Sequence, residues 1–520
     1  MTRGGAGALV AIALVTGLAL RVARLDVRPM HHDEANQAVK FAALLERGEY
    51  RYDARDHHGP TLYYLSVPAA LLRGQTTLAS LDERTLRGVT AAFGAAAILL
   101  LPLLTPAIGR TAVAAAAWLL ALSPAMVFYS RMFIQESMFV CFTLAFAIAL
   151  GRLARGGGSG WAAIAGAAAG LAAATKETAA LVLPAALAAC AIAWWTSPRD
   201  GVPSKSPWPR PAFTGVATAA AVAALFYSSF LTEPAGLLDP FRAAATYFDR
   251  GLAPESHVQP WHYYLGLLAY SSSDGVWWSE GVVLALALAG AAAAFRPPAA
   301  SRPGRAFWVR YLAGYAVITL ATFSAIRYKT PWNLLPFYAG IIVLAGIGVS
   351  TLVHAARSRA LRAALAAALA IGGLHLGWQA WRASVTYAAD PRNPYAYAQT
   401  VPDAVRMASR IRDLAAHHPA RALMQVSVIA PPHEQWPLPW YLRTMPHVGY
   451  WSRPDDALAL QAPVIVAAMP FTDELDAVLD GRYISEFYGV RPEVLLTLYI
   501  ERGLWDRFLA DVTGNAAAAQ

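Results

Sequence analysis

Apolar runs of about 20 residues recur through the first part of the chain, up to residue 382, and they contain few charged residues. Runs of this length are typical of transmembrane helices, because about 20 helical residues cross the apolar core of a bilayer. The pattern predicts about eleven spans, near residues 6–25, 86–105, 111–128, 134–152, 160–175, 178–196, 212–231, 275–295, 311–326, 333–354 and 363–382.

Two shorter stretches lie in the long loop 26–85 that follows the first span. Residues 34–48 and 60–73 are too short or too amphipathic to cross the bilayer, so we expect helices lying in the membrane interface. Residues 383–520 have an ordinary composition, with strand-like segments at 423–430 and 462–468 and a helix-like segment at 472–481. The sequence therefore predicts a polytopic α-helical membrane domain (1–382) followed by a small α/β domain (383–520).

Composition and charge support this division and add an orientation. The chain is 57% hydrophobic and only 14% charged, whereas soluble domains average about 25% charged residues. The net charge of +9 would suit nucleic-acid binding, but the Lys and Arg residues gather in alternate loops, as the positive-inside rule requires of cytoplasmic loops. We therefore predict a multi-pass protein of the cytoplasmic membrane, with a cytoplasmic N-terminus, an extracytoplasmic C-terminal domain and no nucleic-acid partner. Arg21, Arg24 and Arg28, just outside the first span, are exceptions to the rule.

Polar clusters at the predicted outer ends of the spans need an explanation, because charges near a membrane are costly unless something compensates them. The first is "HHDE", and the others are the segments "RDHHGPTLYY", "YSRMFIQES", "TKET" and "IRYKTPWN". Acids and bases on one face suit a ligand that carries phosphate and hydroxyl groups. Arg or Lys would hold the phosphate, and a carboxylate would accept a proton from an attacking hydroxyl.

These motifs, together with "WPLPWYLR" (436–443), occur in an order that resembles the GT-C superfamily of polytopic glycosyltransferases. That superfamily includes protein O-mannosyltransferases and aminoarabinose transferases, and the closest resemblance is to a prokaryotic family labelled flippase-activity-associated. The resemblance implies an inverting hexosyltransferase of the family 39 type, which moves a sugar from a polyprenyl-phosphate donor to a hydroxyl of a lipid, glycan or protein at the outer face. One departure is His58-Gly59-Pro60, where relatives often have His-Pro-Pro or Lys-Pro-Pro.

The resemblance also implies roles for individual residues. Asp33 is the candidate base, and Glu34 is expected to support it or to position the acceptor. The candidates for the donor phosphate are Arg131, Arg327, Lys329 and Lys176. The candidates for other substrate contacts are His32, His57, His58, Tyr63, Glu136 and Trp332.

Other interpretations stay open at this stage. The acids could cap the helix at 34–48, Arg131 could extend to the interface, Lys176 could pair with a neighbouring acid, and "WPLPWYLR" could pack the outer domain onto the membrane part. A divalent metal is an alternative for the set His31, His32, Asp33, Asp56, His57 and His58, although the polyprenyl-phosphate branch of the superfamily needs none, and we predict no cofactor.

A transport component that binds lipid-linked saccharides without catalysis is the alternative function. Transporters typically have polar residues or broken helices at mid-membrane. The predicted spans are rich in Ala and Leu, and their polar sites gather at one face. This distribution favours the enzyme.

Overall fold

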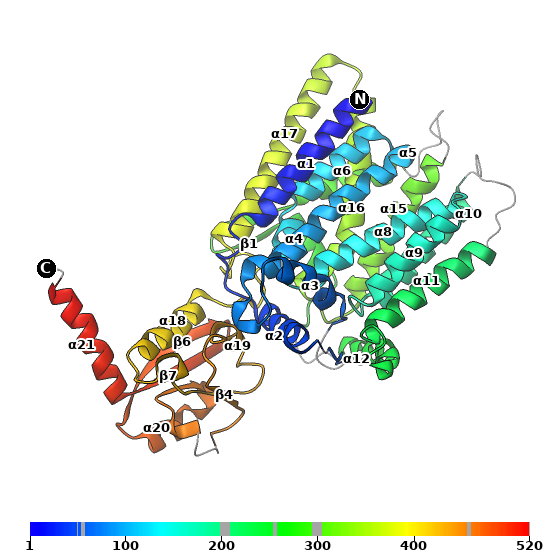
Figure 1. The fold of residues 1–520 in the computed structure, drawn as a ribbon. Helices are drawn as coiled ribbons and strands as arrows, with labels where there is room; N and C mark the ends of the chain where they lie inside the picture. The colour runs from blue at the N-terminus through cyan, green and yellow to red at the C-terminus, as the bar shows by residue number, and fades with distance from the viewer. Residues whose placement is uncertain are drawn as a thin grey trace.

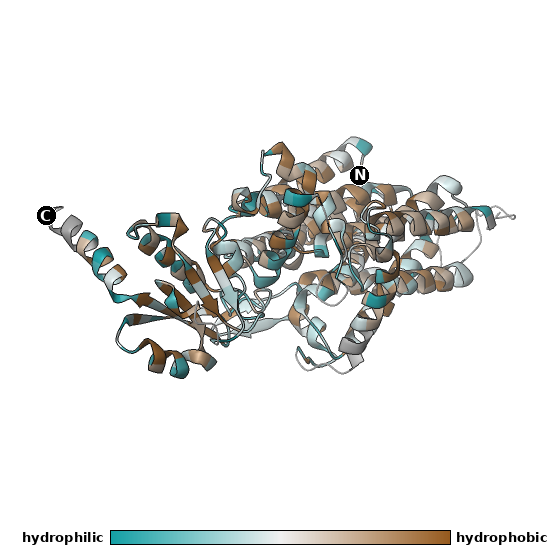
Figure 2. Cartoon of the chain, turned by 60° about the horizontal axis from the view of Figure 1, so that its bottom comes forward, coloured by the Kyte–Doolittle hydropathy of each residue, from teal (hydrophilic) through white to brown (hydrophobic). Residues whose placement is uncertain are grey.

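The computed structural model describes all residues except 49, 54–57, 198–208, 253–256, 294–303, 455–458 and 519–520. It has a large helical part and a smaller α/β domain beside one end of the helices (Figure 1). Apolar residues predominate on the helices of the large part (Figure 2).

Each predicted span corresponds to a helix. These are α1 (Arg3–Val22), α4 (Glu83–Leu100), α6 (Arg110–Leu122), α8 (Glu136–Ala154), α9 (Ser159–Ala173), α10 (Ala179–Thr196), α11 (Pro209–Tyr227), α14 (Gly281–Ala292), α15 (Arg305–Ala325), α16 (Leu335–Ala355) and α17 (Arg359–Trp381). Among the described residues, seven helices are long and apolar enough to cross a membrane, or eight if the bent pair of α6 and α7 (Pro124–Ser130) counts as one span. The membrane fold is confirmed, and the count of eleven stays a prediction.

The two amphipathic stretches of the loop 26–85 are helices, as predicted: α2 (His32–Arg47) and α3 (Thr61–Leu72). The segment between α11 and α14 contains α12 (Asp239–Leu252), α13 (Tyr263–Ala269) and a small hairpin of β1 (Ser271–Ser273) and β2 (Val276–Trp278). A short helix, α5 (Thr105–Ile108), continues α4. Helices α8 and α16 are the most enclosed spans, while α17 is largely exposed at the edge beside α1 (Figure 1).

The C-terminal domain is a five-stranded sheet in the order β4-β3-β5-β7-β6. Its strands are β3 (Val426–Ile429), β4 (Val448–Trp451), β5 (Val464–Ala468), β6 (Tyr483–Arg491) and β7 (Val494–Glu501). Strand β3 is parallel to β4 and β5, and β7 is antiparallel to β5 and β6. The helices are α18 (Pro402–Ala416), α19 (Leu438–Tyr441), α20 (Thr472–Leu479) and α21 (Arg502–Ala518). The two predicted strands and the predicted helix are present.

The motif "WPLPWYLR" joins this domain to the membrane part. The buried Trp440 donates from its indole nitrogen to Glu83 (2.8 Å), and Arg443 donates to the carbonyl of Leu81 (3.0 Å). The Tyr441 hydroxyl accepts a hydrogen bond from the Met30 amide (2.7 Å), directly before the "HHDE" cluster. The C-terminal domain is therefore anchored to the loop that carries the candidate site.

Candidate functional site

A cavity of about 560 Å³ lies where one end of the helices meets the C-terminal domain. The first loop contributes His32, Asp33, Asn36, Gln37, Lys40 and His58. The helix ends contribute Gln135, Glu136, Lys176, Glu177, Tyr328, Thr330, Trp332 and Asn333, and the C-terminal domain contributes Pro432, His433, Trp436 and Arg491. A larger groove of about 920 Å³ between α1, α6, α16 and α17 is lined almost entirely by apolar residues, so it offers no groups for acid–base chemistry.

Asp33 presents its carboxylate to the cavity from the first turn of α2, and its side chain is 40% exposed. Among the described residues, Nε2 of His32 lies 3.1 Å and Nδ1 of His31 lies 3.6 Å from its carboxylate oxygens. Burial opposes ionisation of this carboxyl, but the charge and hydrogen bond of His32, with the charge of His58, lower the pKa of Asp33 well below its ordinary value. Asp33 is therefore ionised at neutral pH and can accept a proton.

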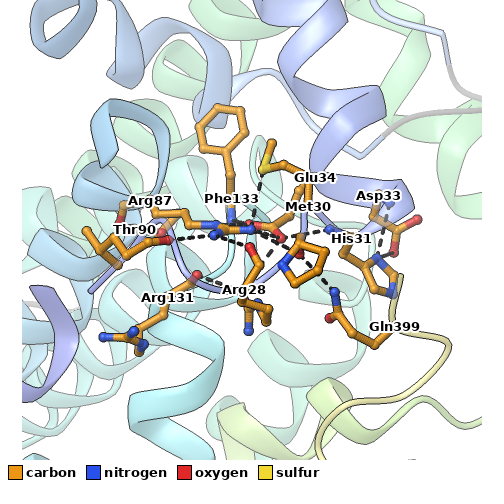
Figure 3. Close-up of polar contacts among 12 residues, drawn as sticks. Arg28, Met30, His31, Asp33, Glu34, Arg87, Thr90, Arg131, Phe133 and Gln399 are labelled. Carbon is orange, nitrogen blue, oxygen red and sulfur yellow. Dashed lines mark hydrogen bonds and ion pairs between the residues drawn. The ribbon is translucent and has the colours of Figure 1, made fainter. Parts of the chain in front are cut away.

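Unlike the carboxylate of Asp33, that of the next residue, Glu34, is enclosed by other residues (Figure 3). Its buried carboxylate accepts hydrogen bonds from Nε and Nη2 of Arg87 (2.7 and 2.8 Å) and from the amides of Phe133 (2.8 Å) and His31 (3.0 Å). Arg28 lies 3.6 Å away. Burial alone would raise the pKa of Glu34, but Arg87 and Arg28 lower it to about 2. Glu34 does not line the cavity, and its contacts hold the start of α2 in place.

His31 caps α2. Its Nδ1 accepts a hydrogen bond from the Asp33 amide (3.1 Å), and its Nε2–H donates to the carbonyl of Tyr397 (3.1 Å). Burial lowers the pKa of His31 to about 3, so the ring is neutral. Among the described residues, His31, His32 and Asp33 form a group whose ligand atoms lie within 4.8 Å of one another. A metal ion at Nδ1 of His31 would need the lone pair that caps the helix.

The cavity lining also contains two ion pairs. Nζ of Lys176 lies 2.5 Å from Oε1 of Glu136 and donates to Asn333 (2.9 Å). Nδ1 of His58 lies 2.6 Å from Oε2 of Glu177. Burial opposes the charge on His58, but Glu177 raises the pKa of this imidazole above its ordinary value. Lys176 and His58 therefore contribute basic groups to the cavity lining, each paired with a carboxylate.

The Gly59 departure from the family pattern has a steric reason. A Cβ at this position would lie 2.2 Å from the carbonyl oxygen of Ala174. The Gly59 amide donates to the carbonyl of Thr175 (3.1 Å), and the Thr61 amide donates to that of Ala174 (3.2 Å). This close backbone contact brings the loop of His58 against the "TKET" segment.

Several predicted site residues lie outside the cavity lining. The Arg131 guanidinium donates to the carbonyls of Leu20 (2.9 Å) and Arg21 (3.1 Å) at the end of α1, so its position differs from the expected phosphate contact. Nζ of Lys329 donates to the carbonyls of Gln259 (3.1 Å) and Ile326 and ties the loop before α13 to the end of α15.

Arg327 is exposed, and Tyr63 is buried with its hydroxyl on Gln37. Neither residue lines the cavity. His57 and Asp56 lie outside the described residues. The predicted positions that do line the cavity are Asp33, His32, His58, Glu136, Lys176 and Trp332.

Two of the three basic residues near the end of the first span, Arg21 and Arg28, also have structural partners. Arg21 donates to the carbonyls of Leu120 (3.0 Å) and Ala121 (3.2 Å), which end α6, and Arg28 lies beside Glu34. These contacts compensate the positive charges of Arg21 and Arg28, which are exceptions to the positive-inside rule.

The C-terminal domain supplies residues that we did not predict from the sequence. Arg491 ends β6 at a shift in strand register, and its guanidinium donates to the carbonyls of His433 (2.8 Å) and Trp436 (3.3 Å). Irregular register near a site is a common way to redirect a side chain. Trp436 belongs to the quoted "WPLPWYLR" motif, whereas no motif pointed to Arg491.

Comparisons with known proteins bear on the family and the fold of the chain. A family model described as dolichyl-phosphate-mannose-protein mannosyltransferase matches residues 11–250. The fold is similar to that of ArnT from Cupriavidus metallidurans bound to undecaprenyl phosphate, with a TM-score of 0.62 and 15% identity over 96% of this chain and 98% of that one.

The fold is also similar to that of the Archaeoglobus fulgidus oligosaccharyltransferase. Its apo form has a TM-score of 0.60 and 14% identity, over 94% of this chain and 74% of that one. Its complex with an inhibitory peptide and a dolichol-phosphate has a TM-score of 0.57 and 14% identity, over 93% and 74%. No curated protein sequence matches the chain.

Proposed function

We propose that this chain, a membrane protein of the GT-C glycosyltransferase superfamily, moves a sugar from a polyprenyl-phosphate donor to an acceptor hydroxyl at the outer membrane face. The observation that carries the proposal is one cavity that is lined by the Asp33 carboxylate together with the basic side chains of Lys176 and His58. Two structures with this fold contain undecaprenyl phosphate or dolichol-phosphate, which supports a donor of that class.

The donor phosphate would lie against Lys176 and His58. Hydrogen bonds between cationic donors and phosphate oxygens are about twice as strong as neutral ones. Lys176 follows the end of α9, and the backbone contact of Gly59 with Thr175 holds the loop of His58 beside it. A phosphate whose chain extends into the bilayer would arrive at this helix end. Arg491 approaches from the outer domain and would face the acceptor side.

Transfer then needs one displacement. The acceptor oxygen bonds to the anomeric carbon as the bond from that carbon to the phosphate oxygen breaks, and the configuration inverts. Asp33 takes the hydroxyl proton, and the polyprenyl phosphate leaves as an anion held by the two cations. A carboxylate with a depressed pKa is a weak base, but the attacking hydroxyl becomes acidic as its new bond forms. General-base catalysis of this kind contributes about 10²–10⁴-fold.

The proposal uses no metal. His31 uses its Nδ1 lone pair to cap α2 and its Nε2–H on Tyr397. Among the described residues of the group, this leaves His32 and Asp33, fewer ligands than a tetrahedral zinc site takes from protein. The leaving phosphate can be stabilised by Lys176 and His58 instead.

We also propose that the N-terminus is cytoplasmic and that the C-terminal domain lies outside the cytoplasmic membrane. The basic inner loops favour this orientation. The cavity then lies on the side where lipid-linked donors, and no nucleotide sugars, are available. Labelling of single cysteines introduced into the C-terminal domain of intact cells would test it, because only an external domain reacts with a membrane-impermeant reagent.

The experiment that tests the function uses the purified chain in proteoliposomes with a radiolabelled polyprenyl-phosphate hexose and a membrane extract. A transferase moves label from the lipid donor to extract components and releases free polyprenyl phosphate. The alternative transport function predicts that the label stays on the polyprenyl lipid and changes leaflet. Label that remains on the donor under all conditions would contradict the proposal.

A further inference from the structure

The groove of about 920 Å³ runs along α1, α6, α16 and α17, and it shares no lining residue with the cavity of the candidate site. Helix α6 lines it from Thr111 to Leu122, a length of about 16 Å at about 1.5 Å per residue. The hydrocarbon core of a bilayer is about 30 Å thick. The groove therefore has the length of an acyl chain in one leaflet and is too short for a helix that crosses the membrane.

The groove-lining faces of α6 and α17 lead to arginines at the beginning of each helix. Arg110 is the first residue of α6, four residues before Ala114 and eight before Trp118, which both line the groove. In α17, Arg362 is seven residues before Leu369, which also lines it. Side chains at these spacings lie on one face of a helix. Both arginines are therefore on the groove side of their helices.

No acidic residue of these helices compensates the arginines. The sequence has no Asp or Glu in residues 1–25, 84–135 or 281–389, which include all four helices of the groove. Arg3, which begins α1, is exposed, as are Arg110 and Arg362. Nε of Arg362 donates to the carbonyl of Ala356 (2.9 Å). In the part of the chain that the structure describes, none of the three arginines pairs with a carboxylate. The groove thus combines an apolar body with a basic end.

We infer that this groove binds an anionic phospholipid, with one acyl chain along α6 and α17 and its phosphate among Arg3, Arg110 and Arg362. Guanidinium groups form strong charge-assisted hydrogen bonds with phosphate oxygens. Basic pockets between transmembrane helices bind anionic head groups in this way. The lipid belongs to the leaflet on the side where α1 begins. The site is separate from the candidate active site, and it does not rest on the proposed function.

A bound lipid would stabilise the position of α17. This helix is largely exposed, and it connects the membrane part to the C-terminal domain (Figure 1). A Cβ at Gly373 of α17 would lie 3.6 Å from Cδ1 of Leu122, which is an ordinary contact. There is therefore room between α17 and α6, which an acyl chain can fill. We expect an anionic phospholipid to raise the melting temperature of the protein.

The test measures lipid binding to the delipidated full chain in detergent by native mass spectrometry. The probes are phosphatidylglycerol and phosphatidylcholine with identical acyl chains, and undecaprenyl phosphate. Arg110→Gln and Arg362→Gln, made together, remove two charges from the basic end, and Gly373→Leu fills the groove without changing any charge. Arg210→Gln is the matched control, because Arg210 is also exposed at the start of a helix, α11, outside the groove lining (Figure 1).

We expect the wild type to bind one phosphatidylglycerol at least about tenfold more tightly than phosphatidylcholine. The double arginine variant should reduce this preference to about twofold or less, and Arg210→Gln should keep it. Gly373→Leu should weaken both phospholipids, because the acyl chain loses its space. Phosphatidylglycerol should raise the melting temperature of the wild type and leave that of the double variant unchanged.

Equal affinity of the wild type for the two phospholipids, or a preference that survives in the double variant, would overturn the inference. Undecaprenyl phosphate that displaces phosphatidylglycerol and is lost in Gly373→Leu would identify the polyprenyl carrier as the occupant and overturn it too. A second copy of the chain that is retained in place of lipid, and released by Gly373→Leu, would have the same consequence. None of these results concerns the cavity of the candidate site, so the proposed function is tested separately.

Discussion

Replacing either of the adjacent acids Asp33 and Glu34 with its amide tests the different roles that we give them. We expect the change at Glu34 to lower stability and the change at Asp33 to remove activity. Glu34→Gln replaces one carboxylate oxygen with an NH₂ group. In either orientation of the amide, that NH₂ group would face two N–H donors: Nε of Arg87 with the Phe133 amide, or Nη2 of Arg87 with the His31 amide. We therefore expect Glu34→Gln to destabilise the fold.

The magnitude follows from burial and charge. Breaking one partner of a buried ion pair costs about 3–5 kcal/mol. The pKa of Glu34 falls from an ordinary value of 4.5 to about 2, which corresponds to about 3 kcal/mol in favour of the charged form. Asp33→Asn should change stability by less than about 1 kcal/mol, because its side chain is 40% exposed and such pairs contribute little.

Thermal melting of the detergent-purified proteins, with transfer activity measured in parallel, checks both variants. Glu34→Gln should melt at a lower temperature and retain activity in proportion to its folded fraction. Asp33→Asn should melt as the wild type does and lose activity. A normally folded but inactive Glu34→Gln protein would refute the structural role given to Glu34.

Three further predictions concern the cavity. Lys176→Ala should weaken binding of undecaprenyl phosphate about tenfold or more, as expected for one charge-assisted hydrogen bond of about 1.5–3 kcal/mol. Lys329→Ala should not weaken it. Binding titrations measure both variants, and equal effects would contradict the assignment of Lys176 as the phosphate ligand. Because Glu177 raises the pKa of His58, donor binding should be complete below pH 6.5 and decline as the pH rises through the raised value. A His58→Gln variant should lack this decline in the same titrations. Activity should survive dialysis against a chelator, and loss that zinc or manganese restores would establish a metal site around His31.

The membrane fold could be predicted because apolar length and charge placement are local signals. The spans, the helices at 34–48 and 60–73 and the strands at 423–430 and 462–468 depend on residues near one another in sequence. The resemblance to the GT-C superfamily is confirmed, and the closer likeness to the flippase-activity-associated family stays a prediction.

The division of roles within the site could not be predicted in the same way. The buried Glu34 carboxylate is paired with Arg87, which is far from it in the sequence. The residues near Glu34 in the sequence do not predict this partner. Lys176 follows α9 and Lys329 follows α15 in the sequence, but tertiary packing directs only Lys176 into the cavity. Arg491 lines the cavity because of how the whole C-terminal domain is positioned.

The most direct test of the account is the rate at which Asp33→Asn releases polyprenyl phosphate from a saturating polyprenyl-phosphate hexose, with donor binding measured on the same protein. The account predicts donor binding within about twofold of the wild type and a release rate lower by about 10²–10⁴-fold. A variant that binds donor normally and releases polyprenyl phosphate at the wild-type rate would contradict the role of Asp33 as the base.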